Sequence, residues 1–173
     1  MITRHISVVA YDSGWVAAFQ KIRTEIASAL GSLALSIEHV GSTSVPGLAA
    51  KPVIDIDVVI ENAGVFAQVC DHLSTVGYSH VGDQDIPGRE VFKYLEKPHL
   101  MKHHLYVCAR DSVELKRHLA FRDYLRAHPE AVSEYSRIKV EGARLFPDDI
   151  DAYILHKTPF IQGLLKIIMP LEK

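Results

Sequence analysis

The segment Val53–Ile60, with the sequence VIDIDVVI, most constrains what this chain can fold into. Its first half alternates between apolar residues and the acids Asp55 and Asp57, and its second half is apolar throughout. Because successive side chains of a strand point to opposite faces, the two acids share one face and the isoleucines the other. The segment is therefore predicted to be a strand with one buried face and two carboxylates about 7 Å apart on the other.

These two carboxylates admit two interpretations. Anions that lie side by side repel each other, and a divalent cation bound between them removes that repulsion, as in two-metal phosphoryl-transfer sites. The alternative is an edge strand whose polar face is simply solvated, because alternating polarity is common in half-exposed strands. The sequence leaves both interpretations open.

A second candidate site lies upstream, where the predicted strand at 35–40 ends in Gly41, Ser42, Thr43 and Ser44. A short helical turn at this point would offer backbone N–H groups and hydroxyl groups to a phosphate, and the glycine would let the ligand approach the backbone closely. The alternative is a tight connection between two elements with no ligand.

The pattern of predicted elements changes along the chain. Before residue 110, helices alternate with strands, whereas after it the helices follow one another. We expect strands at residues 35–40, 53–60, 78–81, 91–95 and 102–109, and helices at 14–30, 62–76 and 111–127, from 129 and from about 148. This order predicts one α/β domain of the α+β type over residues 1–173, with a mixed sheet flanked by helices over 1–110 and a helical annex over 111–173.

Several side chains are expected to begin or line these helices. Asp12 or Ser13 would cap the first helix, and its apolar stripe is expected to contain Trp15, Val16, Phe19, Ile22, Ile26 and Leu30. Asp111 and Glu114 have the spacing of a capping box at the start of a later helix, and Pro129 suits the first turn of the next one.

Composition excludes several classes of protein. The 19 Lys and Arg residues against 21 Asp and Glu residues give a formal charge of −2, so long nucleic acid is not expected as a partner. The two cysteines lie in apolar stretches without the spacing of zinc or disulfide frameworks. The uncharged stretch Ile26–Ile37 is about half of the ~20 residues that a membrane span needs, and the N-terminus lacks the layout of a signal peptide. We therefore expect a cytoplasmic protein with no membrane role.

The spacing of these motifs resembles a known superfamily. The chain has an apolar strand that ends in Gly-Ser, then twelve residues, and then D-x-D in a second apolar strand. This arrangement resembles that of the DNA polymerase β-like nucleotidyltransferases. The longer string IEHVGSTSVPGLAAKPVIDIDVVI, followed by HHLYVC, LAFRDYLRAHPEAVSEY and residues 153–157, resembles the GrpB family, which is assigned to that superfamily. The resemblance extends from about Tyr11 to Ile168 and so covers nearly the whole chain. It implies a nucleotidyltransferase-like fold.

The resemblance also implies a site for a nucleotide and a metal. In active members of the superfamily, the Gly-Ser turn holds the phosphates of a nucleoside triphosphate, and the paired acids bind two Mg²⁺ ions. The matching residues in this sequence are Gly41 and Ser42 for the phosphates, and Asp55 and Asp57 for the metal. A third acid on a neighbouring strand helps to activate the acceptor hydroxyl in those enzymes.

The sequence departs from the superfamily at this third acid. The strand expected to supply it reads MKHHLYVC, in which His104, Tyr106 and Cys108 share one face and His103 lies on the other. His104 would have to stand in, either as a neutral metal ligand or as a general base. Because imidazole suits Mg²⁺ poorly, Mn²⁺ is the alternative to the Mg²⁺ that the resemblance implies. The alternative is that neither histidine belongs to a site, with one packed inward and the other solvated.

Other candidate residues carry an imidazole or a positive charge. His39, two residues before the Gly-Ser turn, could orient a phosphate or a metal ligand, or could be a structural histidine. Lys51, and Arg89 with Lys93 on one face of a strand, could neutralise a triphosphate or could be solvated at the surface. Lys157 resembles the lysine that helical domains of nucleotidyltransferases present to the triphosphate.

The leading expectation is a metal-dependent enzyme that binds a nucleoside triphosphate and transfers its nucleotidyl group to a hydroxyl of a small molecule or protein. One alternative is a non-catalytic nucleotide-binding or metal-binding accessory module linked to coenzyme A or nucleotide metabolism, since some members of the family are fused to dephospho-coenzyme A kinase. Another is a hydrolase that uses the same metal. The sequence leaves open the nucleobase, the acceptor and the oligomeric state.

Overall fold

Five strands form one mixed sheet in the computed structural model, which describes residues 5–170. The order across the sheet is β1-β2-β5-β4-β3, and only β2 and β5 are parallel neighbours. The strands are β1 (Ser36–Val40), β2 (Ile54–Ile60), β3 (Ser79–His80), β4 (Glu90–Lys93) and β5 (His103–Ala109). The acid-bearing strand β2 is thus an interior strand. The interpretation of the two acids as the polar face of a solvated edge strand is wrong.

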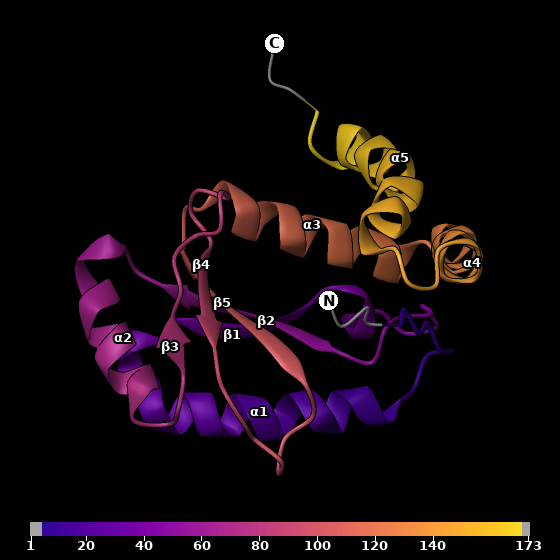
Figure 1. The fold of residues 1–173 in the computed structure, drawn as a ribbon. Helices are drawn as coiled ribbons and strands as arrows, with labels where there is room; N and C mark the ends of the chain where they lie inside the picture. Colours follow the sequence, from indigo (N-terminus) through magenta and orange to yellow (C-terminus); the bar gives the residue numbers. More distant parts are fainter. Residues whose placement is uncertain (1–4, 171–173) are drawn as a thin grey trace.

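One face of the sheet is covered by α1 (Gly14–Leu30) and α2 (Phe66–Ser74), as Figure 1 shows. The isoleucines of β2 are fully buried there against the apolar stripe of α1, which contains Trp15, Phe19, Ile22, Ile26 and Leu30. Val16 was expected on this stripe but is 53% exposed. The stripe repeats every three to four residues from Trp15, and Val16 falls one position away from it.

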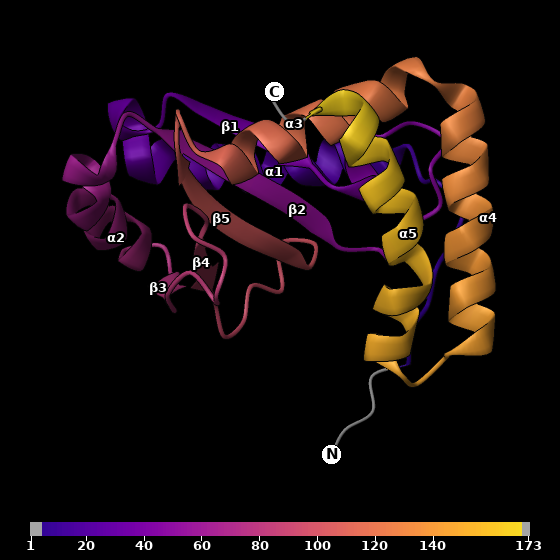
Figure 2. The same ribbon diagram turned by 90° about the horizontal axis from the view of Figure 1, so that it is seen from above.

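The other face meets a helical annex of α3 (Val113–Ala127), α4 (Pro129–Leu145) and α5 (Ile150–Ile168). Figure 2 shows α3 crossing the sheet while α4 and α5 run side by side at one end of the molecule. Leu115 of α3 packs on Val59 and Cys108, which lie on the same sheet face as the two acids. A second apolar cluster joins the loop after β1 to the annex through Val45, Leu48, Leu125, Ala131, Val132, Tyr135 and Leu164. The annex is therefore held directly above the Gly-Ser turn.

The helix starts differ slightly from the expected ones. At α1 the Asp12 carboxylate accepts a hydrogen bond from the Gly14 amide at 2.8 Å, and Ser13 makes no capping bond. At α3 the cap is Ser112, whose hydroxyl accepts from the Leu115 amide at 3.3 Å, so the capping box predicted at Asp111 is one residue too early. Pro129 opens α4 as predicted.

Three short 3₁₀ turns complete the fold: η1 (Gly31–Leu33), η2 (Ser42–Ser44) and η3 (Ala63–Val65). Of these, η2 follows β1 and leads to the acid-bearing strand, so the connection expected to be a helical turn does form one. None of the helices within residues 5–170 has the length and apolar content needed to cross a membrane.

Candidate nucleotide and metal site

The two acids of β2 face the annex and each meets an imidazole. The parallel register places Asp55 beside His104 and Asp57 beside Tyr106 on β5. The His104 Nδ1 atom donates to the Asp55 carboxylate at 2.9 Å. His104 thus lies next to the acids, as predicted. Its Nδ1 atom bonds a carboxylate, and Nε2 takes no part in that bond. Its role as a metal ligand or base stays a prediction.

Asp57 is completely buried and is held by a residue that the sequence did not indicate. His118 of α3 donates from Nδ1 to Asp57 Oδ2 at 2.7 Å. Burial alone would lower the pKa of His118, but the hydrogen bond and the charge of Asp57, with a smaller effect of Glu114, raise it overall. The other oxygen, Asp57 Oδ1, has no hydrogen-bond partner among the described residues. A carboxylate oxygen buried without a donor is costly, and a water molecule or a cation can satisfy it.

The backbone of Gly41 lies directly against the first of these acids. Gly41 has φ 72°, and a Cβ atom at this position would collide with the Asp55 carboxylate. Only glycine combines this conformation with so close an approach. The Ser44 hydroxyl donates to the Gly41 carbonyl, and Thr43 Oγ1 bonds His39 Nε2 at 2.9 Å. The side chains of Thr43 and Ser44 therefore brace the turn, and a role for these two residues in nucleotide binding stays a prediction.

Replacing Gly41 by alanine is expected to destabilise the fold by about 2–4 kcal/mol, because the methyl group adds steric overlap to an unfavourable φ. Urea denaturation measures the change. The matched control is Gly163→Ala on α5, where nothing lies within 4 Å of the added Cβ, and this variant should be neutral or slightly stabilised. Equal stability of Gly41→Ala and wild type would contradict the described turn.

His39 has a structural role in this arrangement. It is 8% exposed, bonds Thr43 and stacks on Phe19 with ring centres 4.7 Å apart. Burial, aided by the charge of Arg126, lowers the pKa of His39 to about 4. A neutral, enclosed imidazole positions the Gly-Ser turn from behind, so of the two interpretations for His39 the structural one describes its contacts.

Three lysines gather beside the turn from the loop, α4 and α5. We call Lys51, Lys139 and Lys157 the lysine cluster. The ammonium groups of Lys51 and Lys157 lie 5.7 Å and 5.0 Å from the centre of the Tyr153 ring, and that of Lys139 lies 4.7 Å from the Tyr135 ring. Tyr135 is also a neighbour of the Ser42 side chain. The two predicted phosphate-binding lysines, Lys51 and Lys157, thus share one ring, and Lys139 lies on the ring that neighbours Ser42.

Electrostatics set this cluster apart from an ordinary surface patch. Lys139 is 2% exposed, and burial with repulsion from Lys157 and Lys51 lowers its pKa to about 7. Burial and repulsion from Lys51 likewise lower the pKa of Lys157 to about 8, while Asp55 opposes both shifts. No carboxylate forms a salt bridge with any of the three in residues 5–170. Amines that are buried without an anionic partner are suited to binding an anion.

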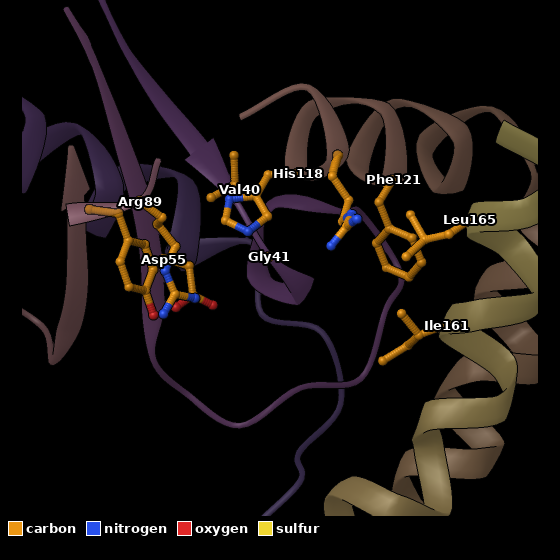
Figure 3. A pocket seen from close by; sticks show the side chains of 10 residues that line it. Val40, Gly41, Asp55, Arg89, His118, Phe121, Ile161 and Leu165 are labelled. Carbon is orange, nitrogen blue, oxygen red and sulfur yellow. The ribbon is translucent and has the colours of Figure 1, made fainter. Parts of the chain in front are cut away.

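A cavity of about 320 Å³ adjoins the acids on the side of α3. Figure 3 shows Asp55 and Arg89 at one end, His118 in the middle, and Phe121, Ile161 and Leu165 at the other end. The Arg89 guanidinium lies 4.5 Å above the centre of the Tyr106 ring, and its Nε atom is buried without a hydrogen-bond partner in the described part of the chain. Arg89 is therefore brought to the site, although it precedes β4 and is not a strand residue as expected.

Two other predicted residues lie elsewhere. His103 faces the opposite side of the sheet, where it is buried, stacks on Tyr94, donates from Nδ1 to the Met101 carbonyl and accepts at Nε2 from the Tyr78 hydroxyl. It is a core histidine whose hydrogen bonds are satisfied. Lys93 is exposed and lies outside the cavity that contains Arg89.

The sequence reasoning missed His118, Lys139 and Arg117. Lys139 had a usable signal, because it falls on the same stripe of α4 as Ala131, Val132, Tyr135 and Gly142, all of which are buried. Because lysine is almost never fully buried unless it is paired, a lysine on an otherwise apolar stripe is a residue to single out. The sequence contains no such signal for His118 and Arg117, because only the docking of α3 brings them to β2.

A family model described as GrpB protein matches residues 5–166. The chain is 32% identical over 159 residues to the UPF0157 protein YqkA of Bacillus subtilis, covering 92% of this chain and 46% of that protein. It is 35% identical to the UPF0157 protein BH1888 of Halalkalibacterium halodurans, covering 93% and 81%. The chain thus spans less than half the length of the first relative and most of the second.

A more distant similarity reaches proteins with another name. The dephospho-CoA kinase of Mycolicibacterium paratuberculosis is 27% identical over 182 residues, which are 91% of this chain and 44% of the kinase. The similar segment is therefore one part of a longer protein.

Solved structures support the fold directly. The crystal structure of GrpB from Enterococcus faecalis has a TM-score of 0.82 and 34% identity, and covers 94% of this chain and 96% of that one. At 13% identity, the structure of the GLD-2/RNP-8 complex has a TM-score of 0.61 and covers 91% and 61%. The Cid1 poly(U) polymerase, at 8% identity, has a TM-score of 0.55 and covers 78% and 43%.

The expected mixed α/β fold with the architecture of nucleotidyltransferases is confirmed by these likenesses. Three findings agree: the family model matches residues 5–166, relatives are above 30% identical, and a solved structure superposes over nearly the full length. The chain therefore belongs to the GrpB family.

Proposed function

We propose that this protein binds a nucleoside triphosphate and transfers its nucleotidyl group to a hydroxyl of an acceptor. One observation carries the proposal: the lysine cluster, which has no carboxylate partner in the described residues, lies beside a Gly-Ser turn that touches the carboxylate Asp55. Uncompensated amines suit a polyphosphate, and carboxylates suit the cation that accompanies it.

The acids present fit a divalent cation that is shared with the substrate. Asp55 and Asp57 lie on one face, and Asp57 Oδ1 is buried without a donor. No group of three or more His, Cys, Asp or Glu side chains within residues 5–170 forms a complete metal site. This suits Mg²⁺, which protein sites often hold through one or two carboxylates plus substrate phosphates and water. When bound, such a cation neutralises phosphate charge and favours the ionised form of the acceptor hydroxyl.

The residues of the chain have distinct tasks in the proposed reaction. The acceptor oxygen forms a bond to the α-phosphorus, the bond from that phosphorus to the bridging oxygen breaks, and pyrophosphate leaves. Lys139, Lys157 and Ser42 would bind the leaving end, which accumulates negative charge. The acceptor proton would pass to Nε2 of His104, whose ring is oriented by the bond from Nδ1 to Asp55.

Thermal unfolding tests nucleotide binding without a known acceptor. The wild type is heated with ATP, GTP, CTP or UTP, each with Mg²⁺, Mn²⁺ or a chelator. A ligand at a hundred times its Kd adds about 2.7 kcal/mol, a clear rise in Tm for a domain of this size. We expect at least one nucleotide to stabilise the protein, and Lys157→Met to lose most of that rise.

The matched control is Lys166→Met, an exposed lysine on the same helix, which should keep the full rise. If no nucleotide raises the Tm under any metal condition, the proposal fails.

A second candidate function is favoured by the match to dephospho-CoA kinase, in which a segment similar to this chain makes up 44% of the protein. This supports an accessory module that binds a nucleotide without reacting with it. Stabilisation by a nucleotide, together with no release of pyrophosphate over hours in the presence of acceptors, would favour the accessory role.

A further inference from the structure

The cavity beside Asp55 combines a charged end with an apolar end. Arg89 lies next to Asp55 at one end, and the other end is made by Phe121, Ile161 and Leu165 from α3 and α5 (Figure 3). Its volume of about 320 Å³ is at the lower limit of ligand pockets. It suits a small molecule with a polar and an apolar part and is too small for a polymer segment.

Arg89 is the cation of this cavity that is free to bind a ligand. Arg117 bonds Glu114 at 2.9 Å, and His118 bonds Asp57, so both already face a carboxylate. Arg89 forms no salt bridge in the described residues, and its Nε donor is buried and unpartnered. Contacts on two sides hold its segment in place: its guanidinium lies over Tyr106, and the neighbouring Gly88 carbonyl accepts from Ser112 Oγ at 2.8 Å. A fixed guanidinium with a free donor recognises a carboxylate or a phosphate.

The cavity and the lysine cluster are neighbours that share Asp55 and one face of α5. Lys157, Ile161 and Leu165 follow each other at four-residue spacing along that helix, so the lysine and the apolar end of the cavity lie on the same side of it. In a phosphoryl-transfer reaction the attacking and leaving oxygens are roughly in line on opposite sides of the phosphorus. With the leaving end at the lysines, the adjoining cavity is where an acceptor can approach.

We propose that this cavity is the acceptor site, and that the acceptor is a small molecule with an anionic group and an apolar body. The anionic group, a carboxylate or a phosphate, binds Arg89, and the apolar body packs on Phe121, Ile161 and Leu165. Because Arg89 and Asp55 lie at the same end, the reacting hydroxyl lies near the anionic group. The assignment as acceptor site rests on the proposed function, whereas the anion site itself is independent of it.

Isothermal titration with phenyl phosphate, phenylacetate and the neutral benzyl alcohol tests this site. We expect at least one of the two anions to bind, benzyl alcohol to bind at least tenfold more weakly, and Arg89→Gln to weaken the anion at least tenfold. The preferred anion identifies the group as phosphate or carboxylate. Arg144→Gln, an exposed arginine of α4, is the matched control and should leave the affinity within twofold. Arg89→Lys, which keeps the charge, should restore part of the binding if Arg89→Gln folds poorly.

Competition separates this site from the nucleotide site. Inorganic tripolyphosphate should leave binding of the phenyl anion unchanged, and Lys157→Met should weaken tripolyphosphate alone. Three outcomes would each overturn the proposal. Tripolyphosphate displaces the phenyl anion, ATP displaces it although tripolyphosphate does not, or benzyl alcohol binds as tightly as the anions. Absence of tripolyphosphate and nucleotide binding, with the phenyl anion still bound through Arg89, would reject the proposed function and leave the anion site standing.

Discussion

Asp55→Asn is expected to abolish the metal-dependent part of nucleotide binding and to lower nucleotidyl transfer at least about a thousandfold. The amide has the size of the carboxylate, so the contact with Gly41 is preserved, but the charge that a cation needs is gone. A loss of about 4 kcal/mol of charge stabilisation in the transition state corresponds to this factor. The measurements are the rise in Tm with nucleotide in Mg²⁺ or Mn²⁺ against chelator, and the release of pyrophosphate.

Asp71→Asn provides the control for this substitution, because Asp71 is an exposed carboxylate on α2, on the opposite side of the sheet. It should behave as wild type. The metal assignment would be wrong if Asp55→Asn kept the wild-type difference between Mg²⁺ and chelator.

Lys139→Met is expected to stabilise the protein by about 2–4 kcal/mol at pH 7 while weakening nucleotide binding at least tenfold. Methionine fills a similar volume without a charge, and removing a buried ammonium group removes its desolvation cost. The pKa of Lys139 is lowered from 10.5 to about 7 in the folded protein, mainly by burial. At pH 7 the folded state therefore carries much of that cost, which the unfolded chain avoids.

The same pKa shift gives the sign of the pH dependence. Between pH 7 and 10.5 the unfolded chain binds more protons at Lys139 than the folded protein does, so this residue makes wild-type stability rise with pH. Lys139→Met should lack that contribution, and its advantage over wild type should shrink from pH 7 to pH 10. Urea denaturation at these two pH values measures it. Lys166→Met should follow the wild-type dependence, and a Lys139→Met variant that is less stable than wild type at pH 7 would contradict the buried cluster.

Much of the fold could be predicted because its signals are local. The alternation in β2, the stripe of α1 and the proline that opens α4 each depend on residues close together in the sequence. The errors are also local, since Ser112 replaces Asp111 as a cap and Val16 lies beside the stripe rather than on it. Neighbouring residues of similar chemistry compete for such places, and packing decides between them.

The site divides along the same line. Asp55 and Asp57 could be placed on one face from the sequence, because strand periodicity fixes it. Gly41 was indicated by the Gly-Ser motif after the first strand, and His104 by the resemblance to nucleotidyltransferases. His118, Lys139 and Arg117 reach the site from helices that begin more than fifty residues after β2. Their positions depend on how α3 and α4 dock, which neither spacing nor composition specifies.

By itself, the sequence determined the order of the elements and the face that carries the two acids, since each follows from backbone geometry over a few residues. Only the tertiary structure decided that β2 is an interior strand, that Gly41 lies against Asp55, and that His39 and His103 are buried and hydrogen-bonded. It also brought together three lysines, of which Lys139 is buried, that form no salt bridge with a carboxylate in the described residues. The physical reason is that burial and electrostatic neighbours arise from contacts between distant segments. Those contacts lower the pKa values of His39, Lys139 and Lys157.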